Sequence, residues 1–439
     1  MLEKSLVIGV GLFVLVGTFA SIGDRVVSRQ SRPDRVTVIY WEKWTGQEGE
    51  VMREIVNDFN QSQDKIFVKY LNISGIDQKT LLATSGGNPP DIAGLWQEQI
   101  FQFAEAGALL DLSEMANQAG LSRDFYVPTY FDSISGDGKL WALPSTPASI
   151  ALYVRPDLLP PAVGTKETFP KTIEELDELV FRVSKKNPDG SMKFAGFLPS
   201  NPGWWNWSWS FYFGGEIFTD VAPTLNTEEG TEAYEWASGY SKKFGTQSVQ
   251  NFQSGFGNFA SPQDPFLTGK VAMELNGVWK ANSIRTFNPD LKYFVVPFPH
   301  PKSRPDLAGH TLLQLDTLSI PKSAKNPKEA FEFIRYVQRQ DVMEKLVMGH
   351  GKNSPLAKVS DQFFKNHLNP EIKLFDELAR SKHGYFAPKS GFGPQVRGEL
   401  NNAFQEVNAG VKPPKQALAD AEKRVLSLWE KYQKQVLSQ

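Results

Sequence analysis

The chain has 439 residues, of which 41% are hydrophobic and 12% aromatic, and its formal net charge is −2. A chain of this length can bury a large core, and we expect it to form two lobes. The near-neutral charge provides no basic surface for nucleic acid, so a nucleic-acid partner is not expected. Cysteine is absent, which excludes disulfides, thiolate metal sites and a cysteine nucleophile.

The five histidines show no close metal-ligand spacing, and the motif His-Glu-x-x-His does not occur. An Asp-rich calcium loop of the EF-hand type is also missing from the sequence. The sequence therefore predicts neither a metal site nor a cofactor.

The N-terminal segment has the pattern of an export signal. Lys4 precedes an apolar run over residues 6–22, and Thr18-Phe19-Ala20 loosely resembles a signal-peptidase site. The run is long for a cleaved signal and short for a full membrane span, so a cleaved signal and a retained anchor both stay open. No cysteine follows the run, which excludes a lipid-linked cysteine. We expect residues 1–33 to be this signal or anchor plus a linker, and the rest to be periplasmic or on the extracellular face of the membrane.

Strands and helices alternate after this segment, in the pattern of a parallel sheet with right-handed crossovers. Ligands of such sheets bind beyond the carboxyl ends of the strands. Glu42 and Trp44 follow the first strand, and Trp96 and Gln97 end the third. The expected strands cover residues 36–41, 66–71 and 91–96, and the expected helices cover 49–60, 78–85 and 100–106.

From residue 140 the pattern changes, and two short strands around a proline-rich turn are expected before the chain crosses to a second lobe over residues 150–154. A helix follows over residues 172–186, with Thr172 as its N-cap and Glu175 in the capping-box position. Residues from 356 onward are expected to be helical to the end. The other expected elements are helices over 227–244 and 326–340 and a strand over 312–320.

The segment 201–215 holds the densest cluster of aromatic residues. In an extended chain Trp205, Trp207 and Trp209 would share one side, whereas in a helix Trp204 would lie on the same side as Trp209. One set is expected to stack on a ligand and the other to pack in the core, and both arrangements stay open.

Nine stretches resemble, in the same order, landmarks of the extracellular solute-binding proteins of ABC sugar importers, the maltose- and glycerol-phosphate-type binders. The resemblance covers nearly the whole chain after the N-terminal segment. Where the family has Tyr-Asn-Lys, this chain has Tyr153-Val154-Arg155, so that asparagine is replaced here. The stretches are VTVIYWEKWTG, GNPPDIAGLW, AEAGALLDLSEM, GKLWALPSTPASIALYVRPDLL, FPKTIEELDELVFRV, GGEIF, LNTEEG, FLTGKVAMELNGVW and NPKEAFEFIRYV.

The resemblance implies an α/β, periplasmic-binding-protein-like fold, with two lobes that each contain a mainly parallel sheet flanked by helices. A hinge would join the lobes and close them around a ligand. The expected N-terminal lobe consists of residues 34–148 with 311–345, the C-terminal lobe of 149–310 with 346–439, and the hinge of 145–151 and 309–313.

A neutral sugar presents C–H faces that suit aromatic rings and hydroxyls that suit polar side chains. The expected function is to bind a sugar, favoured to be a di- or oligosaccharide, and to deliver it to ABC permease subunits as a monomer. The candidate ligand-binding residues pair an aromatic ring or glycine with a polar side chain at a strand end, or belong to the aromatic segment: Glu42, Trp44, Trp96, Gln97, Trp204, Trp205, Trp209, Asn276, Trp279, His310 and Asp316.

Two other classes of protein are alternatives to this function. A sensory solute receptor would use the same fold to signal to a membrane partner. A glycan-degrading enzyme would need two carboxylates, and nothing singles out a pair among Glu42, Glu98 and Asp316. No Gly-x-Ser-x-Gly elbow and no phosphate-binding loop occurs. We therefore expect a binding protein without catalytic residues.

Overall fold

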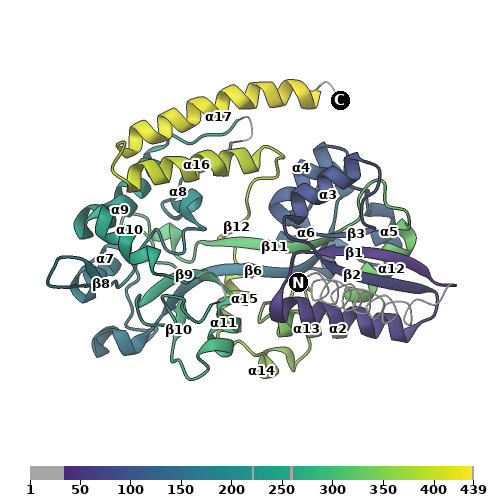
Figure 1. Ribbon diagram of the computed structural model, residues 1–439, viewed down its shortest axis with the longest axis horizontal. Coiled ribbons are helices and arrows are strands. Elements are labelled where there is room, and N and C mark those ends of the chain that lie inside the picture. The colour runs from purple at the N-terminus through teal and green to yellow at the C-terminus, as the bar shows by residue number, and fades with distance from the viewer. Residues whose placement is uncertain (1–33, 220–221, 258–260, 438–439) are drawn as a thin grey trace, which may run out of the picture.

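The structure is a computed structural model that describes residues 34–219, 222–257 and 261–437. The export signal or anchor expected over residues 1–33 lies outside the described residues. Two α/β lobes lie side by side in Figure 1, and the strands β6 and β11 run from one lobe to the other. The predicted two-lobed α/β architecture is confirmed.

The first lobe contains the predicted β-α-β-α-β-α order. β1 pairs in parallel with β2 and with β3, as the sequence predicts. The observed helix bounds differ from the expected ones by up to three residues. For example, α2 starts at Gly46 and α4 at Gln97, each three residues earlier than expected. The elements of this part of the chain are β1 (Val36–Glu42), α2 (Gly46–Ser62), β2 (Ile66–Asn72), α3 (Ile76–Ser85), β3 (Ile92–Trp96), α4 (Gln97–Glu105), α5 (Ser113–Gln118), α6 (Pro128–Asp132), β4 (Ser135–Gly136) and β5 (Lys139–Leu140).

A single long strand replaces the two short strands expected after residue 140, so that prediction was wrong. β6 is buried along its whole length and contains Pro144 and Pro147 without a break. The two prolines lie opposite Thr317 and Leu315 of β11, where the pairing register shifts. Proline cannot donate a backbone hydrogen bond, and a bulge is a place where a sheet accepts it. The strands concerned are β6 (Leu143–Val154) and β11 (Thr311–Ser319).

The second lobe is built on the far half of β6. From Ile150 onward β6 pairs with β9, and its last residues pair with β10 on the other side. Both pairs are antiparallel, so the sheet of this lobe differs in detail from the mainly parallel one that was expected. The elements between the crossing strands are α7 (Ile173–Val183), β7 (Lys185–Lys186), β8 (Met192–Phe194), α8 (Trp209–Tyr212), α9 (Glu228–Phe244), α10 (Thr246–Ser254), β9 (Met273–Gly277), α11 (Lys280–Phe287) and β10 (Phe294–Val296).

Helix α7 begins with the predicted capping box. Thr172 Oγ accepts from the backbone N–H of Glu175, and the Glu175 carboxylate accepts from the backbone N–H of Thr172. The helix ends three residues before the expected end at 186, because Ser184 has an extended backbone and the next residues pair with β8.

The C-terminal region is not one continuous helical stretch, which corrects the expectation for residues from 356 onward. Helices α16 and α17 pack against each other above the second lobe (Figure 1, yellow-green and yellow). The elements after β11 are α12 (Pro327–Val337), α13 (Gln340–Gly349), α14 (Phe363–Asn366), α15 (Ile372–Arg380), β12 (Gly384–Tyr385), α16 (Gly393–Asn408) and α17 (Pro414–Leu437).

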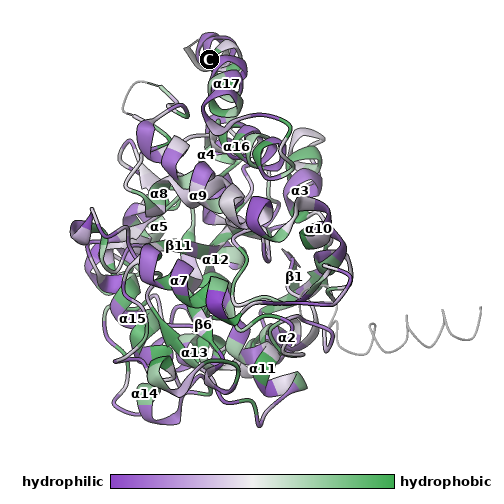
Figure 2. Cartoon of the chain, turned by 90° about the vertical axis from the view of Figure 1, so that its left-hand side faces the viewer, coloured by the Kyte–Doolittle hydropathy of each residue, from purple (hydrophilic) through white to green (hydrophobic). Residues whose placement is uncertain are grey.

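The crossing strands form the centre of the hydrophobic core. Every residue of β6 is buried, and so are all residues of β11 except Gln314. Figure 2 shows hydrophobic residues along these inner strands and hydrophilic ones on the outward faces of the surrounding helices. Within the described ranges, no helix is both long and apolar enough to cross a membrane.

Candidate functional site

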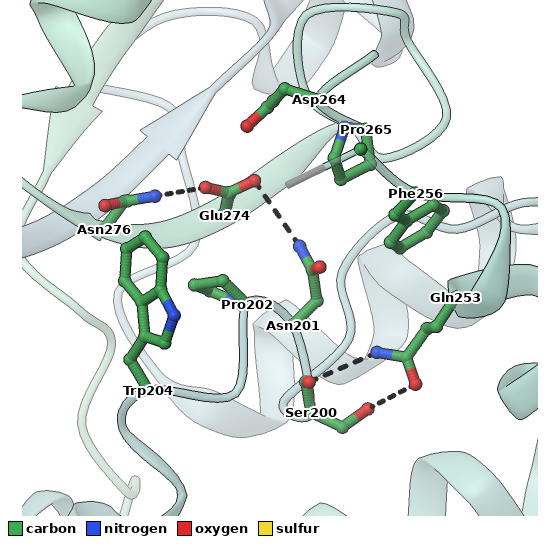
Figure 3. A pocket seen from close by; sticks show the side chains of 11 residues that line it. Ser200, Asn201, Pro202, Trp204, Gln253, Phe256, Asp264, Pro265, Glu274 and Asn276 are labelled. Atoms are coloured by element: carbon green, nitrogen blue, oxygen red, sulfur yellow. Dashed lines mark hydrogen bonds between the residues drawn. The ribbon is translucent and has the colours of Figure 1, made fainter. Parts of the chain in front are cut away.

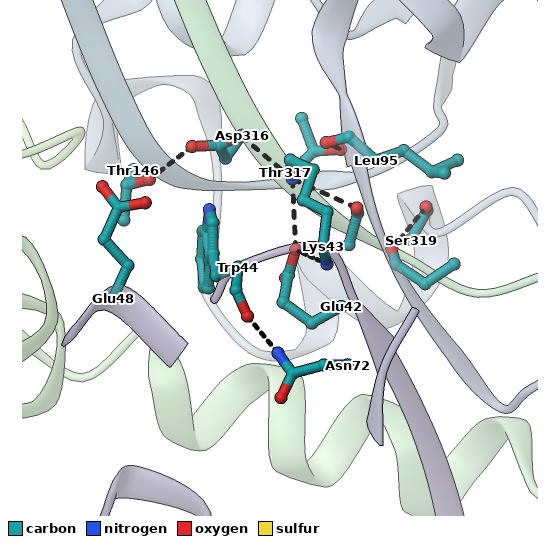
Figure 4. Close-up of polar contacts among 12 residues, drawn as sticks. Glu42, Lys43, Trp44, Glu48, Asn72, Leu95, Thr146, Asp316, Thr317 and Ser319 are labelled. Carbon is teal, nitrogen blue, oxygen red and sulfur yellow. Dashed lines mark hydrogen bonds and ion pairs between the residues drawn. The ribbon is translucent and has the colours of Figure 1, made fainter. Parts of the chain in front are cut away.

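A chain of charges of alternating sign, buried except at the half-buried Glu48, lies where β1 ends, beside the crossing strands (Figure 4). Lys43 Nζ lies 3.1 Å from Glu42 Oε1 and 2.9 Å from Asp316 Oδ1. Lys352 Nζ lies 2.9 Å from Asp316 Oδ2 and 3.7 Å from Glu48 Oε1. Each ammonium group is therefore held between two carboxylates.

Asp316 is the central member of this charge chain. Its Oδ2 also accepts a hydrogen bond of 2.7 Å from Thr146 Oγ on β6. Burial opposes ionisation of Asp316, but Lys352 and Lys43 outweigh it and hold the pKa of this carboxyl well below its usual range. Burial lowers the pKa values of both lysines, yet the neighbouring carboxylates raise them above the ordinary value overall. Lys43, Asp316 and Lys352 are thus ionised together at neutral pH.

Glu42 is buried at the start of the charge chain, and both of its carboxylate oxygens accept hydrogen bonds from the protein. Its Oε2 accepts from Tyr40 OH at 2.6 Å, and its Oε1 accepts from the backbone N–H of Lys43 at 2.8 Å. The carboxylate lies against Gly94, where an added Cβ would be 1.9 Å from Oε2. Burial raises the pKa of Glu42, and the ammonium of Lys43 opposes this rise. In the structure Glu42 anchors Lys43 through an ion pair, and its role as a ligand contact stays a prediction.

The two lysines link three tryptophans. Lys43 Nζ lies 5.2 Å from the ring centre of Trp44 and 4.9 Å from that of Trp96. Lys352 Nζ lies 5.9 Å from the ring centres of both Trp44 and Trp279. Trp44 belongs to the first lobe and Trp279 follows β9 of the second, so the cluster joins the facing sides of the lobes. Cation–π attraction at these distances stabilises both the ammonium groups and the ring orientations.

The aromatic series continues into the second lobe. The ring centre of Trp279 lies 6.4 Å from that of Trp204 and 6.3 Å from that of Trp205. Trp205 is held by a hydrogen bond of 3.0 Å from its Nε1 to Leu275 O of β9. Trp96 at one end and Trp204 at the other are 37% and 40% exposed, so each offers part of its ring to solvent.

A polar cavity of about 310 Å³ adjoins Trp204 (Figure 3). Lys280 Nζ lies 2.6 Å from Asp264 Oδ2 and 2.9 Å from Glu274 Oε1. Asn276 and Asn201 both donate side-chain N–H groups to Glu274. Burial raises the pKa of Glu274, and Lys280 opposes this rise. The cavity therefore has amide and carboxylate groups on one side and an indole ring on another.

Two predicted residues lie away from both groups of side chains. Trp209 is only 1% exposed and packs against Tyr212 and Trp236 in the second lobe. His310 packs between Phe211 and His383 at the start of β11. Asp316 lies six residues further along this strand, which corresponds to about 20 Å. Gln97 lies near the first-lobe group but is buried.

The side-chain amide of Gln97 donates to Ser133 O at 3.0 Å, which holds α4 on α6. The aromatic segment forms tight helical turns over Asn206–Ser208 and Trp209–Tyr212, not an extended chain. As a result Trp205, Trp207 and Trp209 are all buried, and Trp204 is the exposed member of this group.

Sequence reasoning missed Lys43, Lys352, Lys280 and Asp264. Lys43 stands between Glu42 and Trp44, both predicted ligand contacts, so its position after the first strand was a signal for it. Lys352 follows α13 without any motif, and only the fold brings it to Asp316. Among the residues that the structure describes, no group of three or more His, Asp or Glu side chains could hold a metal ion.

The fold consists of two α/β lobes joined by crossing strands, and aromatic rings and buried polar groups lie between the lobes. This arrangement is that of a two-lobed ligand-binding protein of the periplasmic type. Residues 43–344 match the model of the bacterial extracellular solute-binding protein family, and the chain belongs to that family. The resemblance predicted from the sequence is confirmed.

Relatives of the chain support this assignment. The maltotriose-binding protein of Pyrococcus abyssi is 22% identical over 404 residues, which are 91% of this chain and 82% of the relative. The multiple sugar-binding protein of Streptococcus mutans is 23% identical over 440 residues, 91% of this chain and 97% of the relative. A structure of CpMnBP1 with mannobiose bound has a TM-score of 0.80 and 25% identity, covering 89% of this chain and all of that one.

Proposed function

We propose that this chain is the substrate-binding component of an ABC importer and that it binds an oligosaccharide between its lobes. The observation that carries this proposal is the series of indole rings from Trp96 and Trp44 through Trp279 to Trp204, which runs from one lobe to the other. Family membership and the sugar-binding relatives support it.

The chemistry of the proposed site suits a sugar. The exposed rings of Trp96 and Trp204 can stack on the C–H faces of pyranose units. The amides of Asn201 and Asn276 and the carboxylate of Glu274 line the adjoining cavity, where hydroxyl groups need both donors and acceptors. The rings of Trp44 and Trp279 stand between Trp96 and Trp204 in the indole series, and a series of several rings favours an oligosaccharide over a single sugar ring.

The lobes would close around the ligand by rotation about the crossing strands. β6 changes its pairing partner from β11 to β9 between Ser149 and Ile150, which supports a hinge within residues 145–151. We keep the predicted lobe boundaries with one change. α13 packs on α2 and continues to Gly349, so we put the third crossing after that residue and not at 345.

The carboxylates of the site favour a binding protein over an enzyme. Glycoside hydrolysis needs one carboxyl that donates a proton and one free carboxylate. Here Glu42, Asp316 and Glu274 are each in an ion pair with a buried lysine. We propose that the chain acts as a monomer outside the cytoplasm and delivers its sugar to permease subunits. The extracellular solute-binding family supports the location and the transport role.

Isothermal titration calorimetry of residues 34–439 with mannobiose, mannotriose and maltotriose tests the proposal. Loss of a stacked ring is expected to weaken binding about tenfold, or ~1.4 kcal/mol, in Trp96→Ala and in Trp204→Ala. Trp429→Ala is the matched control, because Trp429 packs on Phe218 and Phe392 away from the indole series. Unchanged affinity in both site variants, or no binding of any saccharide, would contradict the proposal.

A further inference from the structure

The numbers of lysines and carboxylates around the proposed site determine whether a charged sugar can bind there. We infer that the site selects uncharged oligosaccharides and excludes acidic ones, whose uronate, sulfate or phosphate groups would find no cationic partner. This inference rests on the proposed function and names the substrate class of the same site.

Every lysine of the site is already occupied by two carboxylates. Lys43 lies between Glu42 and Asp316, at 3.1 and 2.9 Å. Lys280 lies between Asp264 and Glu274, at 2.6 and 2.9 Å. An ammonium group in such a position has little free charge to offer a ligand anion.

The third lysine follows the same pattern. Lys352 lies between Asp316 and Glu48, at 2.9 and 3.7 Å. The nearby guanidinium of Arg397 lies 3.1 Å from Glu98 Oε2, so it is also paired. The described residues that line the cavity next to Trp204 include no lysine or arginine.

The carboxylates outnumber the lysines. Three ammonium groups face five carboxylates, which leaves a net charge of −2; the five are Glu42, Glu48, Asp264, Glu274 and Asp316. Burial raises the pKa of both Glu42 and Glu274. Even with both of these protonated the net charge would be zero, so the site carries no surplus positive charge in either state.

Such a site discriminates by the cost of burying a ligand charge. A carboxylate or sulfate that leaves water without a cationic partner loses its hydration with no compensation. It is also repelled by the excess negative charge at short range, where the effective dielectric constant is low. A neutral hydroxyl at the same position needs only hydrogen bonds, which the amides and carboxylates supply.

Matched pairs of ligands test the inference. Calorimetry would compare mannobiose with the mannuronate disaccharide, and maltotriose with its C6-oxidised counterpart, at 50 and at 500 mM NaCl. We expect the acidic member to bind at least tenfold more weakly at low salt and the difference to shrink at high salt. An acidic member that binds as tightly as its neutral partner would overturn the inference while leaving sugar binding intact. If neither member of either pair binds, the proposed function itself fails and the inference fails with it.

A charge variant provides the second measurement. Glu48→Gln removes one negative charge and leaves Lys352 paired with Asp316 alone, so the ratio of acidic to neutral dissociation constants should fall at least threefold. Glu50→Gln is the control, because Glu50 lies on the same helix with its side chain 66% exposed, paired with Arg53 at the surface. An unchanged ratio in Glu48→Gln, or an equal change in both variants, would contradict the charge mechanism.

Discussion

Replacing Asp316 by asparagine is the sharpest test of the charge chain. The change keeps the shape of the side chain but removes the charge that lies 2.9 Å from both Lys43 Nζ and Lys352 Nζ. Each lysine then keeps one carboxylate instead of two. Breaking a buried ion pair by removing one partner costs about 3–5 kcal/mol, because it leaves an uncompensated buried charge. We expect the free energy of unfolding to fall by this amount in Asp316→Asn.

The pH dependence of this loss has a definite sign. The pKa of Asp316 is depressed in the folded protein, so its contribution is present above the unfolded pKa of about 3.9 and is lost as the pH falls further. The difference in stability between the original chain and Asp316→Asn should therefore be constant near neutral pH. It should shrink below pH of about 4, as Asp316 takes up its proton.

Urea unfolding followed by tryptophan fluorescence and by circular dichroism measures the loss. Asp341→Asn is the control, because Asp341 forms an exposed pair with Arg339 and should cost less than about 1 kcal/mol. A double-mutant cycle with Lys352→Met then isolates the coupling between the two buried charges. A loss below about 1 kcal/mol, or equal to that of Asp341→Asn, would refute the reasoning.

Three further predictions concern stability and are checked by the same urea titrations. Gly94→Ala should lower the free energy of unfolding by about 1–3 kcal/mol, because its Cβ would collide with the Glu42 carboxylate; an unchanged midpoint would contradict this close approach. Thr172→Ala should cost ~1 kcal/mol through loss of the capping box on α7, and rescue by Thr172→Ser would separate the cap from packing. Burial lowers the pKa of His350 to about 4, so stability should decline by up to ~3 kcal/mol as the pH falls from about 6.5 to 4, and His350→Gln should flatten this slope; an identical slope would contradict it.

The first lobe could be predicted from the sequence because its signals are local. Alternating apolar strands and amphipathic helices mark β1 to α4. The capping box of α7 in the second lobe was predictable for the same reason, because Thr172 and Glu175 lie within four residues of chain. β6 could not be predicted, because Pro144 and Pro147 are typical of a turn. They are tolerated in the strand because β11 shifts its register opposite them, a feature of the partner strand that local sequence does not reveal.

The proposed site was predicted in part for a similar reason. Trp44, Trp96 and Trp279 stand at strand ends, where a parallel or mixed sheet places its ligand contacts. Lys352 is 36 residues from Asp316 along the chain, and only the packing of α13 on α2 brings them together. His310 was predicted from its pairing with Gly309 just before a strand; it precedes β11, whose two ends reach different lobes, and Asp316 lies toward the other end.

The charge chain also bears on where the lobes can bend. It joins both crossing strands and the proposed third crossing on the first-lobe side: Thr146 lies on β6, Asp316 on β11, and Lys352 on the segment after α13. Because these groups are buried and mutually paired, separating them during a rotation would expose unpaired charges at a cost of several kcal/mol. The bending point is therefore expected on the second-lobe side of this network, next to Ser149 and Ile150, where β6 exchanges one partner strand for another. Trp279, which contacts Lys352 from the moving lobe, would then change its position relative to Trp44 when the lobes close.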